Sequence, residues 1–452
     1  MTDDGLKRGL AKAFGVRHSL TRRGVRWFDG NVGGSGLIRG ELRHIFPDNW
    51  SFYLGEIALY CFVVLVASGI YLALFFHASE AEVVYQGEYV PLVGVPVSDA
   101  YASVVDLSVS VRAGLLVRQV HHWAALVFIG AVILHLFRMF FSGAYRRPRR
   151  INWLLGLTLL FLGGINGVFG YSLPDDLLSG TGLRIAYSIT ESMPLVGPHM
   201  ASLMFGGDFP TSGLIARIYP VHILLVPMAI AGVLSAHLGL LWLQRHTQTA
   251  GRGRDDRTIV GTPLVPAYAL RTTGYLFLVA GVLTLLGGFV QINPVWLFGP
   301  YHPWDATTAA QPDWYMGWLE GSVRMFPGWD VRIAGIYIPG LFWPAAILPG
   351  LVFGILFLWP WVDAVGSGDN EFHNVLVRPG RRPLQTAFGV AFIVVLVDLL
   401  VAGGNDVFSV WSGVSQPTLL TVLQVLVLVA PLVAMFVTYL ICEGIQRRAG
   451  VR

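Results

Sequence analysis

The stretch RQVHHWAALVFIGAVILHLFR, residues 118–138, is apolar and long enough to cross a bilayer, and it contains His121 and His135, fourteen residues apart. A helix turns about 100° and rises about 1.5 Å per residue, so the second imidazole lies within about 40° of the first and about 21 Å deeper. A second apolar run, at about residues 218–243, contains His222 and His237, fifteen residues apart. Two facing helices of this kind place one histidine pair near each membrane surface.

These four histidines are candidate ligands of heme iron. Imidazole nitrogen suits iron, and an ionisable group inside a membrane helix is rare enough to be a functional candidate. A heme held by two histidines has no open coordination position, so it would carry electrons and not bind oxygen. The alternative, that each histidine only bonds a neighbouring backbone, does not account for two pairs at matching spacing and depth. His122 points about 100° away from His121, and we interpret it as not a ligand.

Arginines and glycines recur with the histidines. Arg118 lies three residues before His121 and Arg138 three residues after His135, on the outward side of each, where a guanidinium could meet the carboxylates of a bound heme. The alternative for both is interfacial snorkelling. Two glycine pairs have the same fourteen-residue period, which would let a flat bulky group approach the backbone: Gly55 with Gly69, and Gly156 with Gly170.

The composition defines a membrane protein. Of the 452 residues 54% are hydrophobic and only 13% charged, whereas about a quarter of a soluble domain is charged. We therefore expect an all-α polytopic membrane protein of eight transmembrane helices, a diheme four-helix bundle followed by a four-helix C-terminal half. The expected spans are about 51–76, 115–141, 151–173, 218–243, 272–293, 339–362, 384–402 and 418–441. The expected regions are 1–48 (cytoplasmic segment with a surface helix), 49–245 (heme-binding bundle) and 246–452 (four spans with a long outer loop).

The distribution of arginine predicts the orientation. Basic loops should be cytoplasmic, and they follow the second, fourth and sixth expected spans, at residues 146–150, 245–257 and 378–382. Both termini are then expected on the cytoplasmic side of a bacterial cell membrane. The N-terminal segment has no apolar signal-peptide core, and residues 36–46 could form an amphipathic helix on the cytoplasmic surface. Nucleic-acid binding is disfavoured because these arginines stand at membrane edges.

The two cysteines limit the cofactors. Cys61 and Cys442 lie inside expected spans far apart in the sequence, and they form neither a CxxCH heme attachment motif nor an iron–sulfur ligand set. An iron–sulfur centre or a c-type heme that works with this chain must therefore belong to another polypeptide.

Two long outer loops are unusual in composition. The first begins GYSLPDDLLSGTGLR, residues 170–184, and is too apolar for solvated coil, so we expect short helices lying on the membrane. The second contains QPDWYMGWLEG, residues 311–321. There, Asp313 stands among Pro312 and aromatic residues with Glu320 seven residues on, which indicates a proton acceptor beside an apolar pocket. The alternative is an aromatic-rich interfacial loop.

Together these marks resemble cytochrome b, the membrane core of the quinol:cytochrome c oxidoreductases. The resemblance covers roughly residues 45–440 and rests on RxxH at 118–121, the second histidine fourteen on, HxxxxP at 222–227, GYxLP at 170–174 and PDWY at 312–315. The glycines at 55, 69, 156 and 170 fall where this family packs its hemes. PDWY in place of the commoner PEWY resembles the actinobacterial, menaquinol-oxidising branch.

The resemblance implies two b-type hemes and a quinol pocket. His121 and His222 would bind the outer heme beside Arg118, and His135 and His237 the inner heme beside Arg138. Quinol, by this likeness menaquinol, would be oxidised at the outer face, with Asp313 taking a proton and Tyr315 and Glu320 assisting. Other expected residues of that pocket are Gly182, Pro312 and Trp314. One electron would pass to a Rieske iron–sulfur subunit and one through both hemes to a quinone at the inner face, coupled to proton translocation.

The inner quinone site departs from the family pattern. Trp242 stands where many relatives have a polar residue, and Arg271–Thr272 replaces the usual Lys–Asp pair. The candidates there are Arg271, His246 and Asp256. Further partners implied by the resemblance are a cytochrome c subunit, which could be diheme, a second copy in a homodimer, and a terminal oxidase in a supercomplex. Two other functions remain open: the diheme anchor of a different redox enzyme, which would lack the PDWY loop, and a transporter that binds no heme.

Overall fold

The computed structural model describes residues 44–305 and 311–450. Within these ranges eight helical segments are long and apolar enough to cross a membrane, which confirms the expected all-α polytopic fold. The spans are α3 (Tyr53–Ala73), α5 (Gly114–Phe141), α6 (Arg150–Tyr171), α9 (Leu214–Pro220) continued through η3 (Val221–Leu225) into α10 (Val226–Gln244), η4 (Leu264–Tyr268) with α11 (Ala269–Phe289), η6 (Trp343–Ile347) with α14 (Leu348–Ser367), α15 (Pro383–Gly403) and α17 (Gln416–Arg448).

Several span boundaries differ from the expected ones, and the eighth span runs to Arg448 and not to about residue 441. The fifth span begins at Leu264 and not near residue 272, with an extended residue, Val265, interrupting its first turn before the regular helix α11 starts at Ala269. The same helix ends at Phe289 because Val290 takes an extended conformation. Of the expected surface helix at residues 36–46, residues 36–43 lie outside the described ranges. Its last residues are wrong as a helix, since Ile45–Phe46 form the strand β1.

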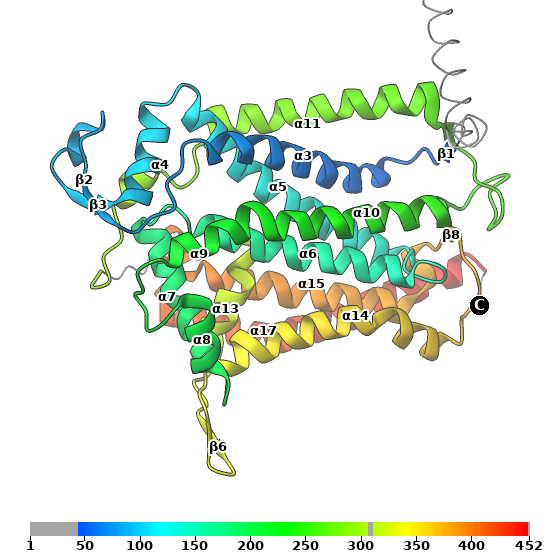
Figure 1. Cartoon of the computed structure of the whole chain (residues 1–452). Helices are drawn as coiled ribbons and strands as arrows, with labels where there is room; N and C mark the ends of the chain where they lie inside the picture. Colours follow the sequence, from blue (N-terminus) through cyan, green and yellow to red (C-terminus); the bar gives the residue numbers. More distant parts are fainter. Residues whose placement is uncertain (1–43, 306–310, 451–452) are drawn as a thin grey trace, which may run out of the picture.

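The bundle carries short elements at both ends (Figure 1). The helices of one end include α7 and α8, which lie in the first long outer loop, where short helices are expected. At that end lie β2 (Glu82–Val84), β3 (Pro96–Ser98), α4 (Asp99–Val109), α7 (Leu177–Glu191), α8 (Gly197–Phe205), α12 (Val295–Phe298), α13 (Gly317–Met325), β6 (Val331–Ile333), β7 (Ile336–Ile338) and α16 (Asn405–Ser412). At the other end β1 pairs with β5 (Thr262–Pro263), and β4 (Gln248–Thr249) pairs with β8 (Val375–Leu376).

Helices that are distant in the sequence pack together. The span α5 lies against α3 and α11, α6 lies against α10, and α15 lies against α13 and α17. Many large apolar side chains remain exposed on the spans, among them Met228, Phe277 and Leu428, as expected of helices that face lipid. Both cysteines are free and buried.

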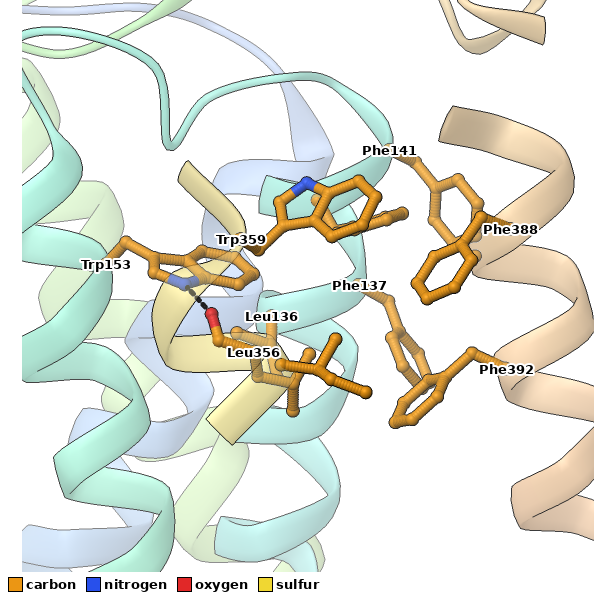
Figure 2. Close-up of a pocket in the computed structure, with 11 residues that line it drawn as sticks. Leu136, Phe137, Phe141, Trp153, Leu356, Trp359, Phe388 and Phe392 are labelled. Carbon is orange, nitrogen blue, oxygen red and sulfur yellow. Dashed lines mark hydrogen bonds between the residues drawn. The ribbon is translucent and has the colours of Figure 1, made fainter. Parts of the chain in front are cut away.

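An aromatic seam joins the two halves of the bundle (Figure 2). Trp153 of α6 donates its indole N–H to the carbonyl of Leu356 on α14, at 2.7 Å. The ring of Trp359 stacks on that of Phe388 from α15, with centroids 5.0 Å apart. These rings leave a cavity of only about 20 Å³, so the seam is a packed contact that fixes α14 and α15 against the first half.

Candidate functional site

The outer histidine pair faces across a gap. His121 projects from α5 and His222 from the π-helical turn η3, with ring centroids 6.2 Å apart and planes at 74°. A metal–imidazole bond is about 2.0 Å and a ring centre lies about 1 Å behind its nitrogen, so two rings on opposite sides of one ion have centres roughly 6 Å apart. The observed spacing fits one ion between the two rings.

Hydrogen bonds orient three of the four rings through Nδ1. His121 bonds Ser68 Oγ at 2.9 Å, His222 the carbonyl of Asn166 at 2.9 Å, and His237 the carbonyl of Asn152 at 3.2 Å. Such bonds fix the tautomer and leave Nε2 for a ligand. His135 has a buried Nδ1 that bonds none of the described residues.

A local irregularity of the fourth span aims His222. The turn Val221–Leu225 is π-helical and is followed by Pro227, which has no N–H to continue the regular helical ladder. Pro227 thus directly follows the π turn that carries His222.

Each of the four glycines lies against a different histidine. A methyl group added to Gly170 would meet Cε1 of His222 at 2.5 Å, closer than van der Waals contact allows. The corresponding distances are 3.3 Å from Gly69 to His121, 3.3 Å from Gly55 to His135 and 3.6 Å from Gly156 to His237. The fourteen-residue periods of the glycines and of His121 with His135 thus bring one glycine to each ring.

Each histidine pair lines a cavity that is also lined by arginine, Arg118 at the outer cavity and both Arg138 and Arg149 at the inner one. Arg118 lines the outer cavity of about 170 Å³, and Arg138 the inner cavity of about 310 Å³. Arg118 donates to the carbonyl of Asn293 at 3.3 Å but has a buried, unbonded Nε, and Arg138 has one unbonded terminal nitrogen. Buried guanidinium N–H groups without partners suit the carboxylates of a heme.

Two nitrogens are too few to hold a bare metal ion. In the part of the chain that the structure describes, no group of three or more histidine, cysteine or acidic side chains could ligate one. A pair of facing imidazoles therefore suits an ion that carries its other ligands with it, as the iron of heme does. The residues present fit heme at both cavities.

A larger pocket of about 560 Å³ opens beside the outer cavity. Five residues expected near quinol line it: Gly182 of α7, Pro312, Asp313, Tyr315 and Glu320 of α13. Trp314 is not among its lining residues, and its indole ring lies next to Gly130 of α5.

Asp313 contacts His122, the histidine that we interpret as not a heme ligand. His122 Nε2 lies 2.7 Å from Asp313 Oδ1, with both side chains largely buried, and the Tyr315 hydroxyl lies 3.3 Å from Oδ2. Asp313 lines both the outer pocket and the cavity of His121 and His222. The adjacent pair His121–His122 could have indicated this contact, because the residue that follows a ligand points to the neighbouring face of the helix.

The rest of the outer pocket is electrostatically compensated. Arg324 pairs with Glu320 and also with Asp406, the second at 3.2 Å. Burial raises the pKa of Glu320 above its usual value, and Arg324 opposes that rise. Burial and the neighbouring Asp313 raise the pKa of Tyr315, so its phenol stays protonated and can donate.

The inner candidates are separated by the fold. His246 lines the inner cavity, but Arg271 pairs with Asp48 at 2.7 Å and does not line it. Asp256 accepts hydrogen bonds from the backbone N–H groups of Asn374 and Val375, and it too is outside the lining.

The fold and the site define a class: an eight-span membrane protein in which two histidine pairs, each with glycines and an arginine, are stacked along the bundle. Residues 126–300 match the family model described as Cytochrome b(N-terminal)/b6/petB. The chain is similar to cytochrome bc1 complex cytochrome b subunits of Streptomyces coelicolor, 46% identical over 93% of this chain and 77% of that protein, and of Mycobacterium tuberculosis, 45% identical over 91% and 75%. A solved structure described as a hyperthermophilic respiratory complex III shares the fold, with a TM-score of 0.69 at 21% identity over 93% of this chain and all of that one.

The chain therefore belongs to the cytochrome b subunits of the cytochrome bc1 complex, and the relatives compared are actinobacterial. This confirms the resemblance drawn from the sequence. The family brings with it a b-type heme cofactor, a place in a multi-subunit oxidoreductase and a multi-pass position in the membrane. It also decides against a different diheme anchor and against a transporter.

Proposed function

We propose that this chain oxidises a quinol in the outer pocket, gives one electron to an iron–sulfur subunit and one to its own hemes, and reduces a quinone near the opposite face. The observation that carries the proposal is the position of Asp313, which lines the quinol-sized pocket and the outer histidine cavity together. A proton acceptor shared by both spaces would allow proton release to accompany electron departure.

In this proposal the chain handles the proton through a small network. Asp313 accepts a proton from the quinol hydroxyl, and its bond to His122 holds the carboxylate in place at 2.7 Å. Aspartate is one methylene shorter than the glutamate usual in the family, and this bond supports the carboxylate from α5. Tyr315 donates to the other carboxylate oxygen, and Glu320 lines the same pocket.

The four histidines are proposed as the ligands of two b hemes. His121 and His222 would hold the outer heme with Arg118 beside it, and His135 with His237 the inner heme beside Arg138. When bound, the hemes would supply two one-electron sites, about 21 Å apart along α5. The chain fixes their order through the helix period and the glycines that admit them.

The remaining proposals concern direction and partners. The arginine-rich loops lie at the end of the bundle where β1 and β8 are found, and we propose that this end is cytoplasmic. The PDWY wording favours menaquinol as the substrate. A Rieske subunit, a cytochrome c subunit and a second copy of the chain are proposed partners, since this chain carries no iron–sulfur or c-heme ligand set.

The test is an Asp313→Asn variant of the complex purified with its partner subunits. We expect quinol:cytochrome c reduction to fall by about 100-fold, the usual scale for loss of an acid–base group, with heme content unchanged. Asp208→Asn is the matched control, because Asp208 is an exposed outer carboxylate that lines none of the three cavities. Undiminished turnover in Asp313→Asn would remove this residue from the reaction.

A further inference from the structure

The inner cavity has a polar group that the heme assignment does not use. Glu56 follows Gly55 on α3, and since successive helical residues point about 100° apart, it turns from His135 toward α11. Its carboxylate accepts hydrogen bonds from Thr272 at 2.7 Å, from Tyr60 at 3.0 Å and from Tyr268. All four side chains line the same cavity as the inner histidine pair.

The surroundings of this carboxylate are those of a group that exchanges protons. In the described part of the chain, Glu56 has three hydroxyl donors and no recorded ion pair with arginine, lysine or histidine. These hydroxyl donors hold the Glu56 carboxylate at the wall of the inner cavity, within reach of a molecule bound there.

The hydroxyl cluster also explains the departure of this sequence from the family pattern. Of the pair Arg271–Thr272, the threonine faces the cavity and bonds Glu56, while the arginine faces outward to Asp48. The carboxylate that lines the inner cavity beside this end of the fifth span is thus Glu56 of α3. Tyr268, one turn earlier on the fifth span, completes the contact.

We propose that Glu56 is the catalytic proton donor to the quinone reduced at the inner face, an inference that rests on the proposed quinone reduction. The quinone gains two electrons, delivered from the outer quinol through the chain's hemes, and two protons. Each carbonyl oxygen becomes a hydroxyl. Glu56 gives its proton to one oxygen and is reprotonated from water at the inner surface, which also supplies the second proton.

Other titratable groups surround this carboxylate and would share in its pH dependence. From α3 and the fifth span come Tyr53, Tyr60, Tyr268, Arg271 and Tyr275, and from the other walls His135, Arg138, Arg149, His237 and His246. Among the described residues, Arg138 and Arg149 bond groups other than Glu56. A substitution of either arginine therefore changes the electrostatic field at Glu56 and leaves its hydrogen bonds in place.

The experiment uses the complete complex with its hemes reduced rapidly through the outer site, then mixed with a short-tailed naphthoquinone. In Glu56→Gln we expect reoxidation of the inner heme to slow at least about ten-fold, while heme reduction through the outer site keeps its rate. Glu56→Asp should restore most of the rate, and Glu371→Gln, which changes an exposed carboxylate outside the cavity lining, should behave like the wild type. Equal reoxidation in Glu56→Gln and wild type overturns the proposal.

The two levels of proposal fail differently. If the wild-type inner heme is not reoxidised by the quinone, the proposed inner-site reaction fails; if it is, and Glu56→Gln matches it, only the role of Glu56 fails. Should Glu56→Gln lose its inner heme, the infrared difference spectrum on quinone reduction decides. A carboxyl C=O band that shifts in Thr272→Val supports the assignment, and one that does not shift overturns it.

Discussion

Single carboxylates at the outer end differ in what surrounds them. Asp313 is bonded to His122, and Glu320 is paired with Arg324, but Asp175 lies half-buried without a recorded ion pair in the described residues. Burial, with the nearby charge of Glu80, raises the pKa of Asp175 to about 7. Asp175 therefore titrates in the physiological range, at the turn that links α6 to α7.

This shift predicts a pH dependence of stability. Because the pKa of Asp175 is raised in the fold, the folded state binds more protons than the unfolded state between about pH 4 and about pH 7. The free energy of unfolding should fall as pH rises through that window. Asp175→Asn, which suits the left-handed φ of +53° at this position, should remove that fall and melt a few degrees higher than wild type at pH 8 but not at pH 4. Thermal melts of the complex at both pH values check this; parallel curves would contradict it.

At the scale of helices, glycine determines how closely each imidazole approaches the neighbouring backbone. Gly170 on α6 has the tightest contact, since a methyl group there would lie 2.5 Å from the ring of His222. That contact is with a ring held by its own bond to Asn166, so the ring cannot shift without losing that bond. The spacing between α6 and the fourth span at η3 is thus set by a small residue, Gly170, facing a large one, His222, at the same depth.

A pair of alanine substitutions in α6 separates packing from helix propensity. Gly170→Ala should displace His222 and remove the outer heme, about half of the b-type heme per chain. Gly164→Ala, six residues earlier with nothing within 4 Å of the new methyl group, should keep both hemes and gain slightly in helix stability. Heme content by spectrum distinguishes them, and full heme in Gly170→Ala would show that the ring does not depend on this contact.

Helix period made much of the fold and the site predictable from the sequence. The eight spans follow from the length of the apolar runs, and the facing of the histidines and the matched glycines follow from 3.6 residues per turn. The partner of Asp313 did not, because its contact with His122 joins residues 191 positions apart. The contacts of Glu56 could not be predicted either, because its partners Tyr268 and Thr272 lie on another span. That span begins earlier than hydropathy indicates.

In the whole molecule, the strand β1 near the first described residue and the C-terminal end of α17 lie at the same end of the bundle, as an even number of spans requires (Figure 1). We predict that this end is cytoplasmic. A cysteine at Arg252 should react with a membrane-impermeant maleimide only in inverted membranes, and one at Ser412 only in intact cells without a wall. The native cysteines are buried and give little background. The reverse pattern would invert the assignment of outer and inner sites.

The central claim is that two histidine pairs hold two stacked hemes, and the direct measurement is the number of b-type hemes per chain, with the reduced-minus-oxidised spectrum, for wild type, His135→Ala and His122→Ala. We predict two hemes in the wild type, the loss of one in His135→Ala and no loss in His122→Ala, whose imidazole bonds Asp313 instead. A folded complex with an unchanged heme count in His135→Ala, or with one heme lost in His122→Ala, would contradict the assignment.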